Sequence, residues 1–180
     1  DRLQGGDGDD VIGLRELANI EVIDGGTGTN RIVGTSHRDR LDFSAVEIAK
    51  IAVIDGAGGH DILTGSAGDD VFRGGSGADQ IAGGAGVDMV MFDGNYADYT
   101  VTQKDGGVDV TALVTDESTD KLTGIEVLQF QDGQWQNGTF TASATGLPDD
   151  GGDTAPSEPE PDAEPEPAQA VEDTGSVAAD

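Results

Sequence analysis

The residues best suited to chemistry in this sequence are aspartates that recur every nine residues in glycine-rich surroundings. Four contiguous units, residues 56–64, 65–73, 74–82 and 83–91, share Gly first, Gly fourth, Asp sixth and an apolar residue eighth. Carboxylate oxygens are the ligands that hard cations such as Ca²⁺ prefer. The sixth-position residues therefore indicate metal binding: Asp61, Asp70, Asp79 and Asp88.

The same unit occurs earlier in the chain in less regular form. Residues 5–13 and 25–33 follow the pattern, the second with Asn30 in the sixth position, whereas residues 34–42 are degraded. Residues 1–4 fit positions six to nine of a further unit. We therefore expect the chain to begin inside a repeat.

A slower repeat overlies the nonapeptides. Residues 16–24 recur 31 residues later as residues 47–55, and residues 122–128 are a third, weaker echo. The apolar residues in these segments predict short buried strands packed on the coil beside them.

A unit of six turn-forming residues and three extended residues predicts a solenoid. Glycine permits the positive φ angles that reverse the chain, and the apolar eighth residue points inward from a short strand. Two units then close one coil, so that Leu63 and Ile81 of one sheet face Phe72 and Val90 of the other. Such a thin core needs few aromatic residues, which agrees with an aromatic content of only 4%.

Stacking of the coils predicts two columns of sixth-position residues. The spacings place Asp1, Asn30, Asp61 and Asp79 in one column, and Asp10, Asp39, Asp70 and Asp88 in the other. Carboxylates about 4.8 Å apart repel each other, so bare columns are unfavourable. A calcium ion midway between two coils, with ligands at about 2.3–2.6 Å, matches this spacing, and glycine carbonyls in the turns can supply further oxygens. Magnesium, which requires shorter octahedral bonds, fits less well.

The units GGDGDDVIG, GGSGADQIA and GGAGVDMVM resemble the RTX nonapeptide, or hemolysin-type calcium-binding, repeat. The resemblance covers residues 1 to about 91, and residues 99–133 are similar to the β-rich segment that often follows such arrays. It implies an all-β fold, a right-handed parallel β-roll that binds several Ca²⁺ ions. It also implies a bacterial protein that is exported by a type I pathway and folds outside the cell.

The resemblance further implies a ligand set. Its side chains are Asp61, Asp70, Asp79 and Asp88, which form two good sites as the pairs 61/79 and 70/88. Its carbonyl groups belong to the first-position and fourth-position glycines: Gly56, Gly65, Gly74, Gly83, Gly59, Gly68, Gly77 and Gly86. Asp10, Asp39 and Asn30 are weaker candidates, because Asn30 is neutral and Arg38 and Arg40 flank Asp39. An arginine could satisfy the Asp39 carboxylate without any metal.

The chain divides into three predicted regions. Residues 1–91 form the roll, with inserted strand segments at 14–24 and 43–55. Residues 92–146 form a β-rich cap, in which residues 99–103 and 108–114 make a hairpin and Trp135 packs the end of the solenoid. Residues 147–180 hold all six prolines and no base, which predicts a disordered acidic linker rather than a ragged chain end.

Composition excludes several classes of function. The chain has 36 acidic and 9 basic residues, a formal charge of −27, which disfavours nucleic acid as a partner. The segment 147–180 holds eleven of the acids, so 25 acids and 9 bases leave residues 1–146 at −16. Cysteine is absent, and no triad, general acid–base pair or nucleotide motif supports an enzyme.

We therefore predict a non-enzymatic calcium-binding module of a larger extracellular or cell-surface bacterial protein. Its partners would be calcium ions and the neighbouring domains of that protein. The alternative is an adhesive or carbohydrate-binding module of a polysaccharide-active enzyme or adhesin, with Trp135 as a stacking platform for a glycan.

Overall fold

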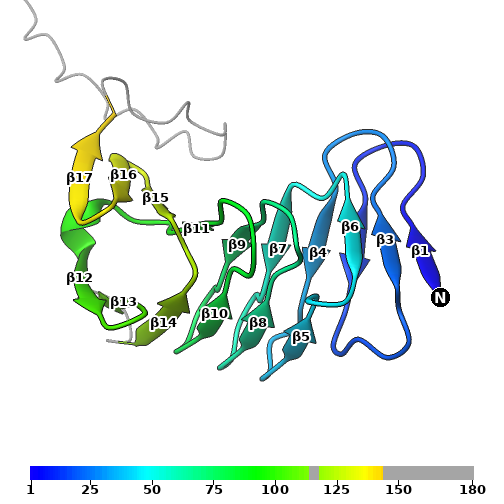
Figure 1. The fold of residues 1–180 in the computed structure, drawn as a ribbon, viewed down its shortest axis with the longest axis horizontal. Coiled ribbons are helices and arrows are strands. Elements are labelled where there is room, and N and C mark those ends of the chain that lie inside the picture. Colours follow the sequence, from blue (N-terminus) through cyan, green and yellow to red (C-terminus); the bar gives the residue numbers. More distant parts are fainter. Residues whose placement is uncertain (114–117, 144–180) are drawn as a thin grey trace, which may run out of the picture. The chain divides into compact units, whose positions relative to one another are not determined.

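The computed structural model describes residues 1–113 and 118–143, which lie in one compact unit. The predicted linker at 147–180 falls outside these residues. The described chain is almost entirely β-structure, which confirms the predicted fold class (Figure 1). Its elements are β1 (Arg2–Gln4), β2 (Val11–Gly13), β3 (Val22–Asp24), β4 (Arg31–Val33), β5 (Arg40–Asp42), β6 (Glu47–Ala49), β7 (Val53–Asp55), β8 (Ile62–Thr64), β9 (Val71–Arg73), β10 (Gln80–Ala82), β11 (Met89–Met91), the 3-10 helix η1 (Tyr96–Asp98), β12 (Tyr99–Lys104), β13 (Gly107–Ala112), β14 (Thr119–Thr123), β15 (Val127–Phe130), β16 (Gly133–Gln136) and β17 (Thr139–Ala142).

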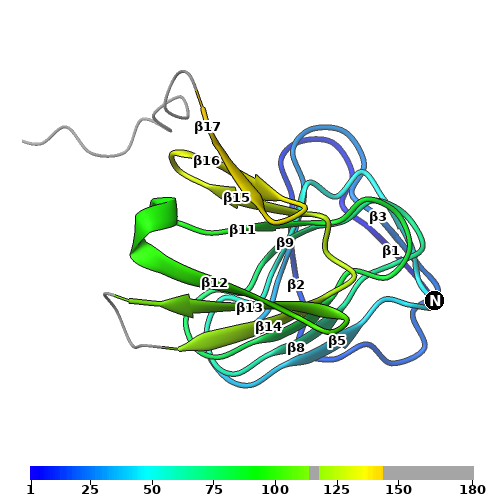
Figure 2. The same cartoon turned by 60° about the vertical axis from the view of Figure 1, so that its left-hand side comes forward.

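Short parallel strands stack into two principal sheets. One has the order β17-β16-β15-β11-β9-β7-β4-β2, and the other has the order β12-β13-β14-β10-β8-β5. Leu63 pairs with Ile81 in the second sheet and Phe72 with Val90 in the first, as expected for coils of two nonapeptides. Figure 2 shows the two faces of this roll, with β5, β8 and β14 on one and β9, β11 and β15 on the other.

The first coils are longer than two nonapeptides. Val11 pairs with Arg31 and Arg31 with Val53, which are steps of 20 and 22 residues, whereas Ile54 pairs with Phe72 after 18. The extra residues belong to the predicted inserted segments, whose strands β3 and β6 join β1 in a third sheet. The insertions therefore become rungs of the solenoid and give its first coils a third side.

The roll continues beyond the last nonapeptide. Strands β14 and β15 pair in parallel with β10 and β11, so residues 119–130 form a further rung. The predicted hairpin is present as β12 and β13, which are inserted before that rung and pair with each other over residues 99–112. Antiparallel strands β16 and β17 complete the edge next to β15. Much of the region predicted as a cap is thus attached directly to the stacked sheets.

The core is a narrow aliphatic stack that becomes aromatic at its C-terminal end. The eighth-position side chains Leu41, Leu63, Phe72, Ile81 and Val90 are buried. Further along the chain Phe92, Tyr96, Tyr99, Phe130 and Phe140 pack together, with ring centroids 4.2–6.4 Å apart. The chain's few aromatic residues are thus concentrated where the regular roll ends, and they cover its open core.

Candidate functional site

The sixth-position residues lie in two columns, one on each edge of the roll. The first carboxylate column contains Asp39, Asp61, Asp79 and Asp120. The second carboxylate column contains Asp10, Asn30, Ala52, Asp70, Asp88 and Glu126. Hydrogen bonds between successive coils define these stacks, and the pairing of β7 with β9 places Ala52 beside Asp70.

The register predicted for the first coils is wrong. Asn30 was expected below Asp61 and Asp39 below Asp70, but Asn30 stacks between Asp10 and Ala52, and Asp39 stacks against Asp61. Because the inserted segments add a third side to these coils, one coil there takes 20–22 residues instead of a multiple of nine. The predicted pairs 61/79 and 70/88 do stack as expected.

Asp61, Asp79 and Asp88 each use one carboxylate oxygen to connect the coils. The Oδ1 atom of each accepts a hydrogen bond from the backbone N–H of the sixth residue one coil earlier. The bonds run from Asp39 N to Asp61 Oδ1 at 2.8 Å, from Asp61 N to Asp79 Oδ1 at 2.7 Å, and from Asp70 N to Asp88 Oδ1 at 2.8 Å. In the folded roll these bonds hold the aspartates in register.

The second oxygen, Oδ2, lies in front of the first-position glycine of its own unit. A Cβ atom on Gly56 would lie 2.7 Å from Asp61 Oδ2 and 2.6 Å from the carbonyl oxygen of Gly74. On Gly34 it would meet Asp39 Oδ2 at 2.8 Å and the Gly56 carbonyl oxygen at 2.6 Å. A side chain at position one would therefore fill a space that a carboxylate and a carbonyl oxygen border. We call this space the glycine cradle.

The glycine cradle places several predicted carbonyl ligands beside carboxylates. The carbonyl groups of Gly56, Gly74 and Gly83 each border the cradle of the preceding coil, at Gly34, Gly56 and Gly65.

Three of the fourth-position glycines, Gly59, Gly77 and Gly86, contact the turn of the preceding coil rather than a sixth-position carboxylate. Gly77 packs on the carbonyl group of Gly59, and Gly86 packs on that of Gly68. Gly59, Gly77 and Gly86 have φ angles of 119–128°, which L side chains rarely adopt. Their role in the structure is close stacking of the turns.

Two of the buried carboxylates need a cation most clearly. Asp61 and Asp88 are each 1% exposed, and their Oδ2 atoms have no hydrogen-bond partner; Asp10 Oδ2 is also buried without one. Buried polar atoms are rarely left unsatisfied, because desolvation without a partner is costly. These oxygens, beside glycine carbonyls, fit a hard cation such as Ca²⁺.

The pKa values of these two carboxyl groups also indicate that the carboxylates lack sufficient positive charge nearby. Burial raises the pKa of Asp61, the hydrogen bond from Asp39 N–H lowers it, and the negative charge of Asp39 raises it. Burial likewise raises the pKa of Asp88, a bond from Asp70 N–H lowers it, and the charges of Asp70 and Glu126 raise it. The ionised forms are thus unfavourable until positive charge is supplied.

At Asp39 and Asp70 the chain supplies its own donors. Asp39 accepts bonds from the N–H and hydroxyl of Thr35, at 2.5 and 3.1 Å. Asp70 Oδ2 accepts bonds from the N–H and hydroxyl of Ser66, at 2.7 and 2.9 Å. The arginine expected beside Asp39 is not its partner in the described part of the chain. The residue after the first glycine therefore changes how strongly each carboxylate needs a cation.

Asn30 occupies a sixth position without a buried carboxylate oxygen that needs a cation. Its Nδ2 group donates to the carbonyl group of Lys50 at 3.2 Å, while its Oδ1 accepts the Asp10 N–H at 2.9 Å. The amide therefore fills the positions of both carboxylate oxygens without a net charge, and the following coil has Ala52 instead of an acid. This part of the second column is satisfied without a metal.

The ligand candidates beyond the nonapeptides were missed from sequence. Asp120 accepts the Asp79 N–H and Glu126 accepts the Asp88 N–H, both at 2.8 Å. A signal was present, because residues 122–128 echo residues 47–55 and Glu126 corresponds there to Ala52, a member of the second column. Only the stacking of β14 and β15 on the roll identifies these acids as members of the columns.

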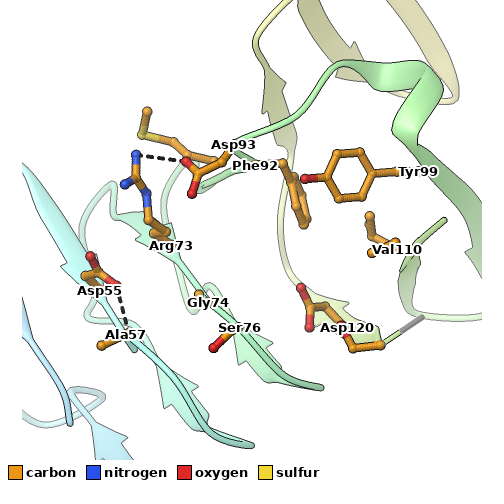
Figure 3. A pocket seen from close by; sticks show the side chains of 14 residues that line it. Asp55, Ala57, Arg73, Gly74, Ser76, Phe92, Asp93, Tyr99, Val110 and Asp120 are labelled. Carbon is orange, nitrogen blue, oxygen red and sulfur yellow. Dashed lines mark hydrogen bonds and ion pairs between the residues drawn. The ribbon is translucent and has the colours of Figure 1, made fainter. Parts of the chain in front are cut away.

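A cavity of about 620 Å³ adjoins the end of the first carboxylate column (Figure 3). It lies where the next turn would stack on Gly74–Ser76, because the chain leaves the roll at Phe92. Arg73, Phe92, Tyr99 and Asp120 line it, and Arg73 forms an ion pair with Asp93 at 3.3 Å. The cavity is mixed in character, with aromatic and charged walls.

Comparison with known families agrees with the geometry of the columns. A family model of the RTX calcium-binding nonapeptide repeat matches four copies, over residues 1–13, 18–45 and 55–90. A comparison with curated proteins finds no match. None of the helices in the described residues is long and apolar enough to cross a membrane. Through residues 1–90, the chain belongs to the RTX calcium-binding nonapeptide repeat family.

Proposed function

We propose that this chain is a calcium-dependent folding module of a larger secreted or surface-attached bacterial protein. The observation that carries the proposal is the pair of buried Oδ2 atoms on Asp61 and Asp88, which lack donors and lie beside glycine carbonyls. Bound Ca²⁺ would supply the positive charge and oxygen coordination that these columns lack. Asp61, Asp88 and Asp10 would be the principal ligands, with Asp79, Asp70 and Asp39 in the adjoining coils.

The columns also explain how folding would depend on the ion. The segment 1–146 has a formal charge of −16, and its carboxylates come within one strand spacing of each other only when the coils stack. Without cations this repulsion favours the open chain, and the ion-binding free energy becomes folding free energy. Extracellular calcium modules of the millimolar class match such a switch.

Membership of the repeat family supports the cellular setting that we propose. RTX repeats are typical of bacterial proteins that are exported by a type I pathway. An unfolded acidic chain inside the cell would remain competent for export, and it would fold on reaching calcium outside. The neighbouring domains of the parent protein would then carry its specific activity.

We propose no catalytic role for this module. His60, an exposed histidine in a turn, accepts a hydrogen bond from Ala78 N–H at 2.9 Å, and this contact connects successive coils. Its position therefore has a structural explanation.

The alternative of a glycan-binding module lacks the platform on which it depended. Trp135 is only 6% exposed and pairs with Leu128 in the C-terminal sheet. An indole that packs against the protein core cannot offer its face to a sugar ring. The calcium-dependent folding module is therefore the function that we retain.

Titration of free calcium should produce a cooperative folding transition. We expect Trp135 fluorescence to shift to shorter wavelength as calcium rises from cytoplasmic to extracellular levels, because the indole becomes buried. Magnesium at the same concentration is the control, and it should produce little of the shift. A spectrum that is independent of calcium, or equally responsive to magnesium, would contradict the proposal.

A further inference from the structure

We infer that the second carboxylate column ends in a calcium site beyond the recognised repeats, built from Asp88, Gly124 and Glu126. The inference rests on the proposed function, since it assigns one more site to the same ion. The family match ends at residue 90, so two of these three residues lie outside it. The site would join the nonapeptide roll to the non-repetitive segment that follows it.

Backbone register places Glu126 where the next sixth-position residue belongs. Met89 pairs with Val127 in the parallel strands β11 and β15, so the preceding residues, Asp88 and Glu126, are also stacked. The Asp88 N–H donates to Glu126 Oε2 at 2.8 Å, and the Glu126 N–H donates to the Asp88 carbonyl group at 3.1 Å. The first bond matches the one that Asp88 Oδ1 accepts from the Asp70 N–H one coil earlier.

The longer side chain of glutamate suits a shorter turn. In the nonapeptide, the turn runs from Gly83 to Asp88, whereas the last rung passes from Gly124 to Glu126 with one residue between them. Gly124 has a φ of 59°, a left-handed conformation that tightens this turn. The additional methylene group of glutamate lets its carboxylate reach the Asp88 N–H from the shortened loop.

The glycine cradle is repeated at this last coil. A Cβ atom on Gly83 would collide with both the Gly124 carbonyl oxygen and Asp88 Oδ2. The equivalent oxygens of Gly74 and Asp61 border the cradle at Gly56. Asp88 is 1% exposed and its Oδ2 has no hydrogen-bond partner. An orphaned, buried carboxylate oxygen therefore faces a carbonyl from the non-repetitive segment, and the Glu126 carboxylate is hydrogen-bonded to the same residue.

The first carboxylate column ends differently. The three atoms closest to a Cβ on Gly74 all belong to Asp79, and none is a carbonyl from the following rung. After β11 the chain leaves the roll at Phe92, so no further turn stacks on Gly74. The cavity of Figure 3 lies there instead. The cradle at Gly83 is thus the place where a bound ion can connect the roll to the C-terminal strands.

Such an ion would control the order of β15, β16 and β17. These strands follow Glu126 directly, pair with one another, and contain Trp135. Occupation of the terminal site would fix β15 on β11 and so complete the sheet that buries the end of the core. Folding of residues 127–142 should therefore depend on this site more than on the lower ones.

The single tryptophan allows this site to be probed separately. Trp135 pairs with Leu128, which lies two residues after Glu126. At ordinary strand dimensions the Cα atoms of Trp135 and Glu126 are therefore about 8 Å apart. Terbium(III), which replaces calcium in oxygen sites, emits when a nearby indole is excited. In the full chain we expect tryptophan-sensitised terbium emission that excess calcium abolishes.

Glu126→Gln keeps an oxygen that can accept the Asp88 N–H but removes the charge. We expect it to lose most of the sensitised emission, to bind one ion fewer in equilibrium dialysis, and to weaken the terminal site by about tenfold or more. Glu16→Gln is the matched control, because Glu16 is exposed and lies outside both columns. It should behave as wild type.

The outcomes separate this inference from the proposed function. A wild-type chain that binds neither ion overturns both. A chain that folds with calcium but gives no sensitised emission when saturated with terbium overturns the terminal site alone, and this result needs no variant. Unchanged emission and stoichiometry in Glu126→Gln also overturn it.

Discussion

Replacing Asp61 and Asp88 together with asparagine should give a protein that folds better without calcium and gains much less when calcium is added. Each asparagine would keep Oδ1 as the acceptor for the N–H one coil earlier. Its Nδ2 group would occupy the place of Oδ2 and donate to the glycine carbonyl beside it. Asn30 already makes both contacts in this chain.

The effect should be large because two costs disappear together. Carboxylates one strand spacing apart repel by about 3.5 kcal/mol at an effective dielectric constant of about 20. A buried acceptor without a donor costs a further 1–3 kcal/mol or so. We expect the double variant to be more stable than wild type in chelator by about 2 kcal/mol or more, and less stable than wild type in saturating calcium.

Urea unfolding followed by circular dichroism, in chelator and in calcium, measures both changes. Asp7→Asn with Glu16→Gln is the control, since it removes the same charge from exposed positions outside the columns. If the Asp61 and Asp88 variant remains as unfolded as wild type in chelator, the assignment of these two Oδ2 atoms as the calcium-dependent groups is wrong.

Phe72→Ala should destabilise the calcium-bound protein by about 3–5 kcal/mol. Phe72 is fully buried and stacks between Ile54 and Val90 in the first sheet. Because the core is a single layer of inward side chains, few neighbours can move to fill the cavity that alanine would leave. The loss is comparable to the whole stability of a marginal domain, so we expect the folding transition to move to much higher calcium concentration.

Phe72→Leu is the control for this substitution. Leucine occupies the eighth position at Leu41 and Leu63, so its shape suits the coil, and a cost below about 1.5 kcal/mol is expected. Urea unfolding in saturating calcium gives both values. A loss below about 1 kcal/mol for Phe72→Ala would mean that the inner stack contributes little to the stability of the roll.

The sequence was sufficient to predict the regular part of the roll. From Gly56 to Met91 every unit has nine residues, so the stacking of Asp61 on Asp79 and of Phe72 on Val90 follows from the period alone. The hairpin of β12 and β13 was also predictable, because Asp105 and Gly106 interrupt two alternating segments.

The register of the first coils could not be obtained from the same rule. Strands in an inserted segment can pack beside the coil or become part of it, and both alternatives preserve the apolar pattern of residues 16–24 and 47–55. The structure adds strands β3 and β6, which shifts Asn30 away from Asp61 and brings Asp39 to it. Glu126 was missed for a related reason, since a glutamate after a short turn does not match the nonapeptide.

The central claim is that the carboxylate columns require calcium in order to stack. The most direct measurement is amide hydrogen exchange together with far-ultraviolet circular dichroism of the wild-type chain, in excess chelator and in excess calcium at equal ionic strength. We predict that the β-sheet signal, and slow exchange of the Asp39, Asp61 and Asp70 amides, occur only with calcium. Equal β-structure and equal protection of these amides in chelator would contradict the claim.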